Sequence, residues 1–285
     1  MQVAPAAPHN SQEYVGTPGN FDIWPPVPLQ RHADLFSNAA APRTPSFNPA
    51  QSYTDQKPAW LRELSLMNDT ELEYSDYNFR ERVRSLQGVD EIMHDMMAML
   101  EARGELENTY FIFTTDNGYH IGQHRMVSGK SMPYAEDTNL PFAVRGPGVP
   151  KGLVSTDPST HLDLAPTFLD IAGLNEKLWP AFLDGRSLLR QWHGESAGDE
   201  EARVATEVIN IEFWGGALFE GPPFSAKPNN SYKTVRIINE QESWYFAKWC
   251  DGTIDTELYN TMVGEPSLQS KEAATNAPFS MILMN

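Results

Sequence analysis

The segment that says most about the architecture reads Thr109-Tyr-Phe-Ile-Phe-Thr-Thr-Asp-Asn-Gly-Tyr-His-Ile-Gly-Gln-His-Arg-Met-Val-Ser-Gly-Lys130. Its residues 110–113 are apolar and β-forming, a run typical of a strand that is covered on both faces. The turn-favouring residues Asp116, Asn117 and Gly118 come next, so the strand is expected to end there. Because open α/β sheets bind ligands outside the carboxyl ends of their strands, we expect Asp116 and Asn117 to point into a crevice.

An amphipathic helix is expected before this strand, from about Asp76 to Arg103, with Gly104 ending it. Apolar residues recur there at spacings of three and four, and we interpret the methionines among them as core packing. A helix, a short loop and an apolar strand in that order form half of a βαβ unit. The predicted class is therefore α/β, with a largely parallel sheet.

Residues that typically start or end helices and strands divide the neighbouring segments. Residues 1–60 are rich in Pro, Ala, Asn and Ser, and they are expected to form a long loop draped over the core. Residues 141–145 predict a short strand. A short, packed helix is expected between Asp163, its acidic cap, and Gly173, with Pro166 in its first turn.

The C-terminal part changes character. A charged stretch at residues 195–203 predicts a boundary, which divides the chain into residues 1–195 and 196–285. Strand-like runs separated by turn residues follow it, at residues 204–214, 232–238 and 243–249. They predict a small antiparallel sheet. The tail from residue 267 to residue 285 has no clear pattern.

The composition excludes several classes of partner and site. The 285 residues include 38 acidic and 21 basic side chains, and the formal charge of -17 argues against a nucleic-acid partner. A single cysteine, Cys250, cannot form an internal disulfide. The amino-terminal residues lack the basic start and apolar stretch of a secretory signal. No segment approaches the roughly 18 apolar residues of a membrane span, so none is expected.

Candidate chemistry gathers after the predicted strand, and each residue has an alternative interpretation. Asp116 and Asn117 supply hard oxygen ligands of the type that Ca²⁺ or Mg²⁺ prefers, although Asp-Asn-Gly can equally be a tight turn. Lys130 follows two glycines and could neutralise an anion held by the metal, or it could be a solvated surface lysine. His120 and His124 are candidates for substrate contact, or they are structural or exposed histidines.

Together these residues resemble a known family. Residues 110–150 are similar to the sulfatases of the alkaline phosphatase superfamily, in particular the fungal arylsulfatase and glucosamine-6-sulfatase type. Further similar segments bring the resemblance to about residues 1–265: Arg82-Val-Arg-Ser-Leu86, Asp163-Leu-Ala-Pro-Thr167, Asp184-Gly-Arg-Ser-Leu188, Glu212-Phe-Trp-Gly215 and Glu257-Leu-Tyr-Asn260. The resemblance implies an alkaline-phosphatase-like mixed sheet flanked by helices. Residues 1–195 would be the C-terminal part of its catalytic domain, and residues 196–285 a small α+β subdomain.

The resemblance also implies roles for individual residues. Asp116 and Asn117 would be Ca²⁺ ligands, and Lys130 would hold a sulfate oxygen. His9, in Ala-Ala-Pro-His, matches a family histidine that contacts the sulfate and helps the leaving oxygen. The implied substrate is a sulfate ester, aryl or sugar, and the implied compartment is extracellular or vacuolar/lysosomal.

One family element is missing from the sequence. Sulfatases attack sulfur with a formylglycine hydrate made from the first residue of a Cys/Ser-x-Pro-x-Arg motif, and Cys250, followed by Asp-Gly-Thr-Ile, does not start one. Asn139 also stands where many sulfatases carry an arginine. We therefore expect the carboxy-terminal half of a sulfate ester hydrolase, inactive alone. The alternatives are a non-catalytic remnant or anion-binding pseudoenzyme, and, third, a phosphoesterase of the same superfamily.

Overall fold

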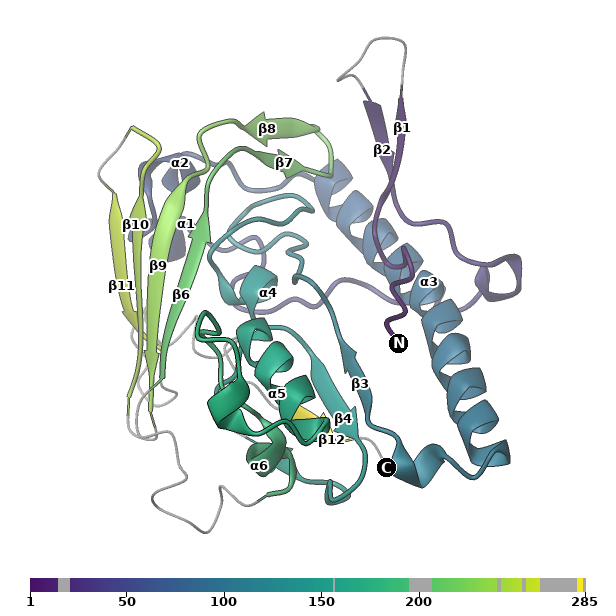
Figure 1. The fold of residues 1–285 in the computed structure, drawn as a ribbon. Coiled ribbons are helices and arrows are strands. Elements are labelled where there is room, and N and C mark those ends of the chain that lie inside the picture. The colour runs from purple at the N-terminus through teal and green to yellow at the C-terminus, as the bar shows by residue number, and fades with distance from the viewer. Residues whose placement is uncertain are drawn as a thin grey trace.

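The computed structural model describes residues 1–14, 21–155, 157–194, 207–239, 242–252, 255–261 and 281–283. Two four-stranded sheets and one long helix dominate this part of the chain. Figure 1 shows the C-terminal sheet on one side of the molecule and the helix α3 (Asp69–Ala102) on the opposite side, with the other sheet and short helices between them.

The first sheet has the strand order β3-β4-β12-β5. Its strands are β3 (Phe111–Thr114), β4 (Phe142–Arg145), β5 (Val154–Ser155) and β12 (Met281–Leu283). Only β4 and β12 pair in parallel; β3 with β4 and β5 with β12 are antiparallel. The prediction of a largely parallel sheet is therefore not confirmed in the described residues, where β3 also lies at a sheet edge and is half-buried. A helix followed by a strand in the sequence predicts only how those two elements connect. Whether the next strand runs parallel or antiparallel depends on the loop that joins it to the first.

The long helix α3 (Asp69–Ala102) begins earlier than predicted. Asn68 and Glu71 form a capping box, in which each side chain accepts a hydrogen bond from the other residue's backbone N–H. Gly104 follows the helix with a φ of 71°, a left-handed conformation that glycine adopts at no steric cost. The helix thus begins seven residues before its predicted start at Asp76.

The burial of α3 differs from the expectation. Its buried residues are polar, namely Ser75, Asn78, Glu81 and Ser85. The predicted apolar face is only half-buried or exposed among the described residues, and Met99 is 46% exposed. Apolar contacts of α3 come instead from Leu72 and Phe79, near its start, which pack against a cluster of Ala41, Phe47 and Ile121. The interpretation of the methionines as core packing is therefore wrong for the described part of the chain.

The short elements before and after these sheets were predicted in part. The strand at residues 141–145 is confirmed as β4, and the predicted helix is α5 (Leu164–Ile171), with Gly173 at a φ of 75° just beyond it. Asp163 is the N-cap residue of α5, as predicted, but its side chain makes no capping hydrogen bond to the helix. Its carboxylate instead accepts hydrogen bonds from the backbone N–H groups of Thr160 (2.7 Å) and Arg186 (2.9 Å). The Asp163 carboxylate therefore connects the start of α5 to the loop that contains Arg186.

Residues 1–60 contain short elements within the expected loop. These are the hairpin of β1 (Ser11–Tyr14) and β2 (Phe21–Trp24), and the helix α1 (Gln51–Thr54), followed by α2 (Ala59–Arg62). Two further short helices are α4 (Ala135–Thr138) and α6 (Leu189–Trp192). Single 3₁₀ turns occur at Gln30–His32, Leu106–Asn108, His161–Asp163 and Glu176–Leu178.

The predicted C-terminal antiparallel sheet is confirmed. Its strand order is β11-β10-β9-β6, and every neighbouring pair is antiparallel. The strands are β6 (Glu207–Phe213), β9 (Tyr232–Ile238), β10 (Ser243–Trp249) and β11 (Thr256–Asn260). A separate two-stranded hairpin consists of β7 (Ala217–Phe219) and β8 (Ser225–Lys227).

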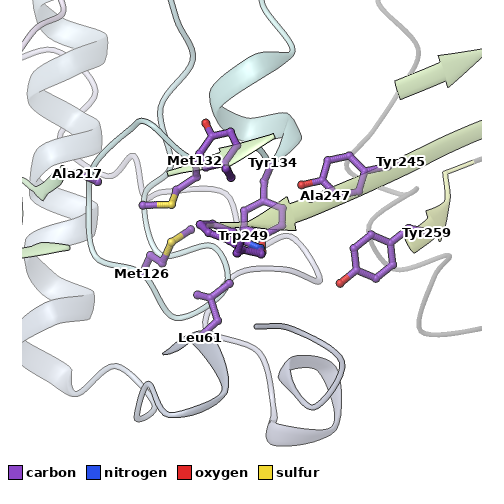
Figure 2. Close-up of a cluster of buried hydrophobic side chains, with 10 residues drawn as sticks. Leu61, Met126, Met132, Tyr134, Ala217, Tyr245, Ala247, Trp249 and Tyr259 are labelled. Carbon is purple, nitrogen blue, oxygen red and sulfur yellow. The ribbon is translucent and has the colours of Figure 1, made fainter. Parts of the chain in front are cut away.

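The largest apolar cluster joins the C-terminal sheet to the rest of the chain. It contains Leu61, Met126, Met132 and Tyr134 from the first part and Tyr232, Tyr245 and Trp249 from the sheet, among others. In Figure 2, Trp249 and Tyr134 lie at the centre of this cluster. The predicted boundary segment at residues 195–203 lies outside the described residues, and the division at residue 195 stays a prediction.

A buried ion pair reinforces this junction. Glu257, whose side chain is 0% exposed, accepts hydrogen bonds from the Tyr134 hydroxyl (2.9 Å), the Trp249 indole (2.7 Å) and the Tyr259 hydroxyl (2.6 Å). The Lys57 ammonium lies 3.5 Å from the same carboxylate and 4.2 Å from the Tyr259 ring centroid. A buried carboxylate requires this number of donors, so the cluster fixes how the sheet packs. No helix of the described residues is long and apolar enough to cross a membrane.

Candidate active site

The turn after β3 presents Asp116 and Asn117 next to a tight backbone contact. Asp116 Oδ1 accepts a hydrogen bond from the Asn117 N–H (3.0 Å), and Asn117 Nδ2 donates to the Gly118 carbonyl (2.8 Å). The Gly118 N–H donates to the Asp137 carbonyl (2.8 Å), and a Cβ at position 118 would lie 2.0 Å from the Glu136 carbonyl oxygen. Only glycine allows the two chain segments to approach this closely.

A pocket of about 230 Å³ opens beside this turn. One part of its lining comes from the segment between β3 and β4, and the other part from the C-terminal sheet. The lining residues are Asn117, Lys130, Ser131, Met132, Asp137, Thr138, Phe213 and Tyr232. Two of the predicted site residues, Asn117 and Lys130, thus share a single cavity with an aromatic wall.

The backbone on both sides of Lys130 is held in place. Gly129 exchanges two backbone hydrogen bonds with His120, each of 3.0 Å. Ser131 has a φ of 76°, in the left-handed region, and its carbonyl accepts a hydrogen bond from Asn230 Nδ2 (2.8 Å). A non-glycine residue with this φ is uncommon and persists where its surroundings fix it. The backbone that carries Lys130 is therefore fixed by its neighbours.

Lys130 meets His9 at this site. The Lys130 ammonium donates a hydrogen bond to His9 Nε2 across 3.0 Å. The other ring nitrogen of His9, Nδ1, donates to the Asn10 carbonyl (2.7 Å), which leaves Nε2 as the acceptor. The proximity that the sequence predicts for these two residues is found, although their roles stay predictions.

His120 lies in the wall behind the pocket. Its ring is 1% exposed, and Nδ1 donates to the Asp137 carboxylate at 2.9 Å. The same carboxylate accepts a hydrogen bond from the Met132 N–H (2.8 Å), so it connects the histidine to the backbone just after Lys130. His120 does not line the pocket.

His124 is also part of the core. It is 0% exposed and packs against the Tyr134 ring at a centroid distance of 4.3 Å, with Nε2 3.6 Å from Glu136 Oε2. Burial opposes the ionisation of Glu136, yet interactions with His124 and Ser46 lower the pKa of this carboxyl to about 2. For both histidines the structure therefore favours the structural alternative over the predicted substrate contact.

The predicted metal ligands have suitable chemistry but are few. Asp116 is exposed and Asn117 half-buried, and each offers the kind of oxygen that Ca²⁺ binds. Ca²⁺ takes six to eight oxygen ligands, and no group of three or more His, Cys, Asp or Glu that could hold a metal occurs among the described residues. These two side chains thus fit part of a Ca²⁺ site, and the role stays a prediction.

The sequence did not single out Asp137 as a site residue. It belongs to the acidic pair Glu136-Asp137 just before β4, and an acidic residue next to a buried strand is the signal that could have found it. Its buried position follows from contacts with His120 and Met132, which the spacing of residues does not show.

Comparisons with known proteins point to one family. The sulfatase family model matches residues 26–174. The chain is 36% identical to an arylsulfatase of Volvox carteri, over 91% of this chain and 42% of that protein. It is 34% identical to the sulfatase ppz1 of Metarhizium majus, over 95% of this chain and 55% of that protein.

A solved structure shares the fold. The structure of BT4656 in complex with its substrate D-glucosamine-2-N,6-O-disulfate aligns with a TM-score of 0.52 and 23% identity, over 74% of this chain and 39% of that one. The chain spans about half the length of the curated relatives it matches, 42% of one and 55% of the other.

Proposed function

This chain belongs to the sulfatase family, and from that premise we propose that it supplies the sulfate-holding part of a sulfate ester hydrolase. The observation that supports the proposal most is the contact of 3.0 Å between Lys130 and His9 beside a pocket that Asn117 also lines. The Lys130 ammonium offers N–H donors to an anion in the cavity, and the His9 ring lies directly beside that ammonium.

In the proposed reaction, these residues bind the sulfate group and assist its departure from the alcohol. The Lys130 ammonium donates hydrogen bonds to a sulfuryl oxygen and stabilises the negative charge there. A new S–O bond forms to the attacking group while the S–O bond to the alcohol breaks. His9 lies beside Lys130, and once its Nε2 carries a proton from solvent and the Lys130 ammonium has turned to the sulfuryl oxygen, it would give that proton to the departing alcohol oxygen.

Two components of this reaction, the group that attacks sulfur and a Ca²⁺ ion, would be supplied in addition to the described side chains. The attacking group of a sulfatase is a formylglycine hydrate, and residues 1–285 contain no Cys/Ser-x-Pro-x-Arg motif. Asp116 and Asn117 would provide two oxygen ligands to Ca²⁺, which when bound supplies positive charge next to the sulfate. We therefore propose that this chain alone does not hydrolyse sulfate esters.

The wall of the pocket suggests what the alcohol resembles. Phe213 and Tyr232 line it, and their rings stack with a centroid distance of 6.1 Å and an interplanar angle of 20°. Such a surface favours an alcohol with a flat apolar face, either an aryl group or the apolar face of a sugar ring. Comparing an aryl sulfate with a glucosamine 6-sulfate as substrates would separate these two.

The alternative is a protein that binds anions without catalysis. The absence of a Cys/Ser-x-Pro-x-Arg motif from residues 1–285 favours it. Reading the genomic DNA upstream of Met1 separates the two proposals. An in-frame Cys-x-Pro-x-Arg segment supports the hydrolase, and its absence supports the anion-binding alternative.

An assay then tests the chemistry of the extended chain. Expressed with such an upstream segment, it should hydrolyse an aryl sulfate faster than the matching aryl phosphate. Lys130→Met should abolish that activity. Preference for the phosphate would instead favour a phosphoesterase of the same superfamily. The compartment stays a prediction.

A further inference from the structure

Both neighbours of His9 are held by two side chains that the proposed chemistry does not use. Arg82 Nη1, on α3, donates a hydrogen bond to the Pro8 carbonyl (2.8 Å). Asn10 Nδ2 donates to the Tyr119 hydroxyl (3.1 Å). The residues before and after His9 are thus attached to two different parts of the fold.

These two attachments form one unit. The Arg82 guanidinium lies 3.8 Å from the centroid of the Tyr119 ring, a cation–π contact. The Tyr119 hydroxyl in turn donates to Glu220 Oε2 (2.8 Å), a carboxylate of a residue that is only 4% exposed. Burial lowers the pKa of Arg82 and raises that of Tyr119 well above its ordinary value, as expected of side chains withdrawn from water.

The backbone N–H of His9 donates to the Ala6 carbonyl (2.8 Å), whereas the His9 side chain has few contacts among the described residues. Its side chain is exposed, and its two hydrogen bonds are to the adjacent Asn10 carbonyl and to Lys130. Asn10, by contrast, is only 4% exposed. The direction of the imidazole therefore depends on how the backbone on either side is held.

We infer that Arg82 and Tyr119 are positioning residues, which hold the Pro8–Asn10 backbone so that His9 meets Lys130. The inference rests on the proposed function, because the role of His9 belongs to it. Holding an exposed histidine in advance removes the cost of ordering it when an anion arrives. Loss of either side chain should leave the pocket intact but loosen the contact between His9 and Lys130.

The test measures that contact without requiring turnover. Residues 1–285 are labelled with ¹⁵N-histidine, and the ring signals of His9 are assigned by their loss in His9→Gln. In the unaltered chain, Lys130→Met should shift the His9 Nε2 signal, because it removes the donor at that nitrogen. In Arg82→Gln or Tyr119→Phe, the shift caused by Lys130→Met should fall to less than half.

Matched variants separate positioning from general stability. Arg80, on the same helix, donates to the Ala39 carbonyl (3.0 Å), so Arg80→Gln removes a similar contact away from His9 and should leave the shift unchanged. Arg82→Lys keeps a donor for the Pro8 carbonyl and should restore part of the shift that Lys130→Met causes in the His9 Nε2 signal. If Arg82→Gln does not fold, Tyr119→Phe, which removes a single oxygen, carries the test.

Two results overturn the inference. One is an unchanged shift in both Arg82→Gln and Tyr119→Phe, and the other is no response of His9 to Lys130→Met in the unaltered chain. Failure of the proposed function would look different, because an extended chain without sulfatase activity could still show the full shift and its loss.

Discussion

The side-chain nitrogens of Lys130 and His9 lie 3.0 Å apart, although 121 positions separate these residues in the sequence. Lys130 reaches this point from a loop fixed by His120, Asp137 and Asn230, and His9 from a segment attached to α3. Two segments that are independently held in this way bring an ammonium donor to the pocket and an imidazole ring next to that donor. The proposed sulfate site depends on this convergence.

Lys130 should dominate the binding of a sulfate ion to this chain. Replacing it by methionine removes a charged donor, and hydrogen bonds to charged groups contribute about 1.5–3 kcal/mol. Sulfate affinity should therefore fall by roughly tenfold or more. Calorimetric titration at constant ionic strength measures this, with Lys151→Met, at an exposed lysine, as the control. Equal losses in the two variants would show that the binding is non-specific.

Gly118 should tolerate no side chain. In Gly118→Ala the new Cβ would lie 2.0 Å from the Glu136 carbonyl oxygen, so the turn and the segment before β4 must move apart. Overpacking of this kind costs about 1–3 kcal/mol or more, measurable by urea unfolding. Gly88→Ala is the matched control, because Gly88 lies within α3 and its Cβ would meet a flexible leucine at 3.3 Å. That variant should be neutral or more stable, and similar losses in both would refute the close contact.

The buried pair of Lys57 and Glu257 should make a large contribution to stability. Glu257→Gln removes the charge beside a buried ammonium, and breaking a buried pair costs about 3–5 kcal/mol. Adding Lys57→Met should recover part of the loss. The exposed pair of Lys233 and Glu212 provides a control, since Glu212→Gln should cost no more than about 1 kcal/mol. Chemical unfolding of these three variants and the unaltered chain checks this, and equal effects of the two Glu→Gln substitutions would contradict it.

Glu136 should make stability depend on acid pH. Its pKa is lowered to about 2 in the folded chain from an ordinary value of 4.5, so its ionised form stabilises the fold above about pH 4.5. This contribution is lost as the pH falls from about 4.5 towards 2. The difference in Tm between the unaltered chain and Glu136→Gln should be largest near pH 7 and should narrow by pH 3. A difference that stays constant over this range would contradict the lowered pKa.

The sequence predicted the elements whose signals are local. The strand before Asp116, the helix before Gly173 and the C-terminal antiparallel strands all carry apolar runs with turn or cap residues at their ends. The start of α3 at Asp69 carried a local signal as well, the Asn68 and Glu71 capping box, but lay before the apolar pattern that was used to place it.

Features set by distant contacts were not predictable in the same way. The antiparallel pairing of β3 with β4, the polar buried face of α3 and the attachment of Pro8 to Arg82 join segments far apart in the chain. His120 and His124 belong to the loop that also carries Lys130, yet both are buried, His120 beside the Asp137 carboxylate and His124 beside the Glu136 carboxylate. A single sequence shows residue types and spacing, but it does not show which of them are buried together.

The central claim is that this chain holds sulfate but lacks the group that attacks sulfur. The most direct test is the hydrolysis of a chromogenic aryl sulfate by purified residues 1–285 with Ca²⁺ supplied, compared with a chain extended upstream to include a Cys-x-Pro-x-Arg segment. The account predicts no turnover above background for residues 1–285, and turnover by the extended chain that disappears in Lys130→Met. Turnover by residues 1–285 that is abolished by Asp116→Ala would contradict it, because it would require a nucleophile within this chain.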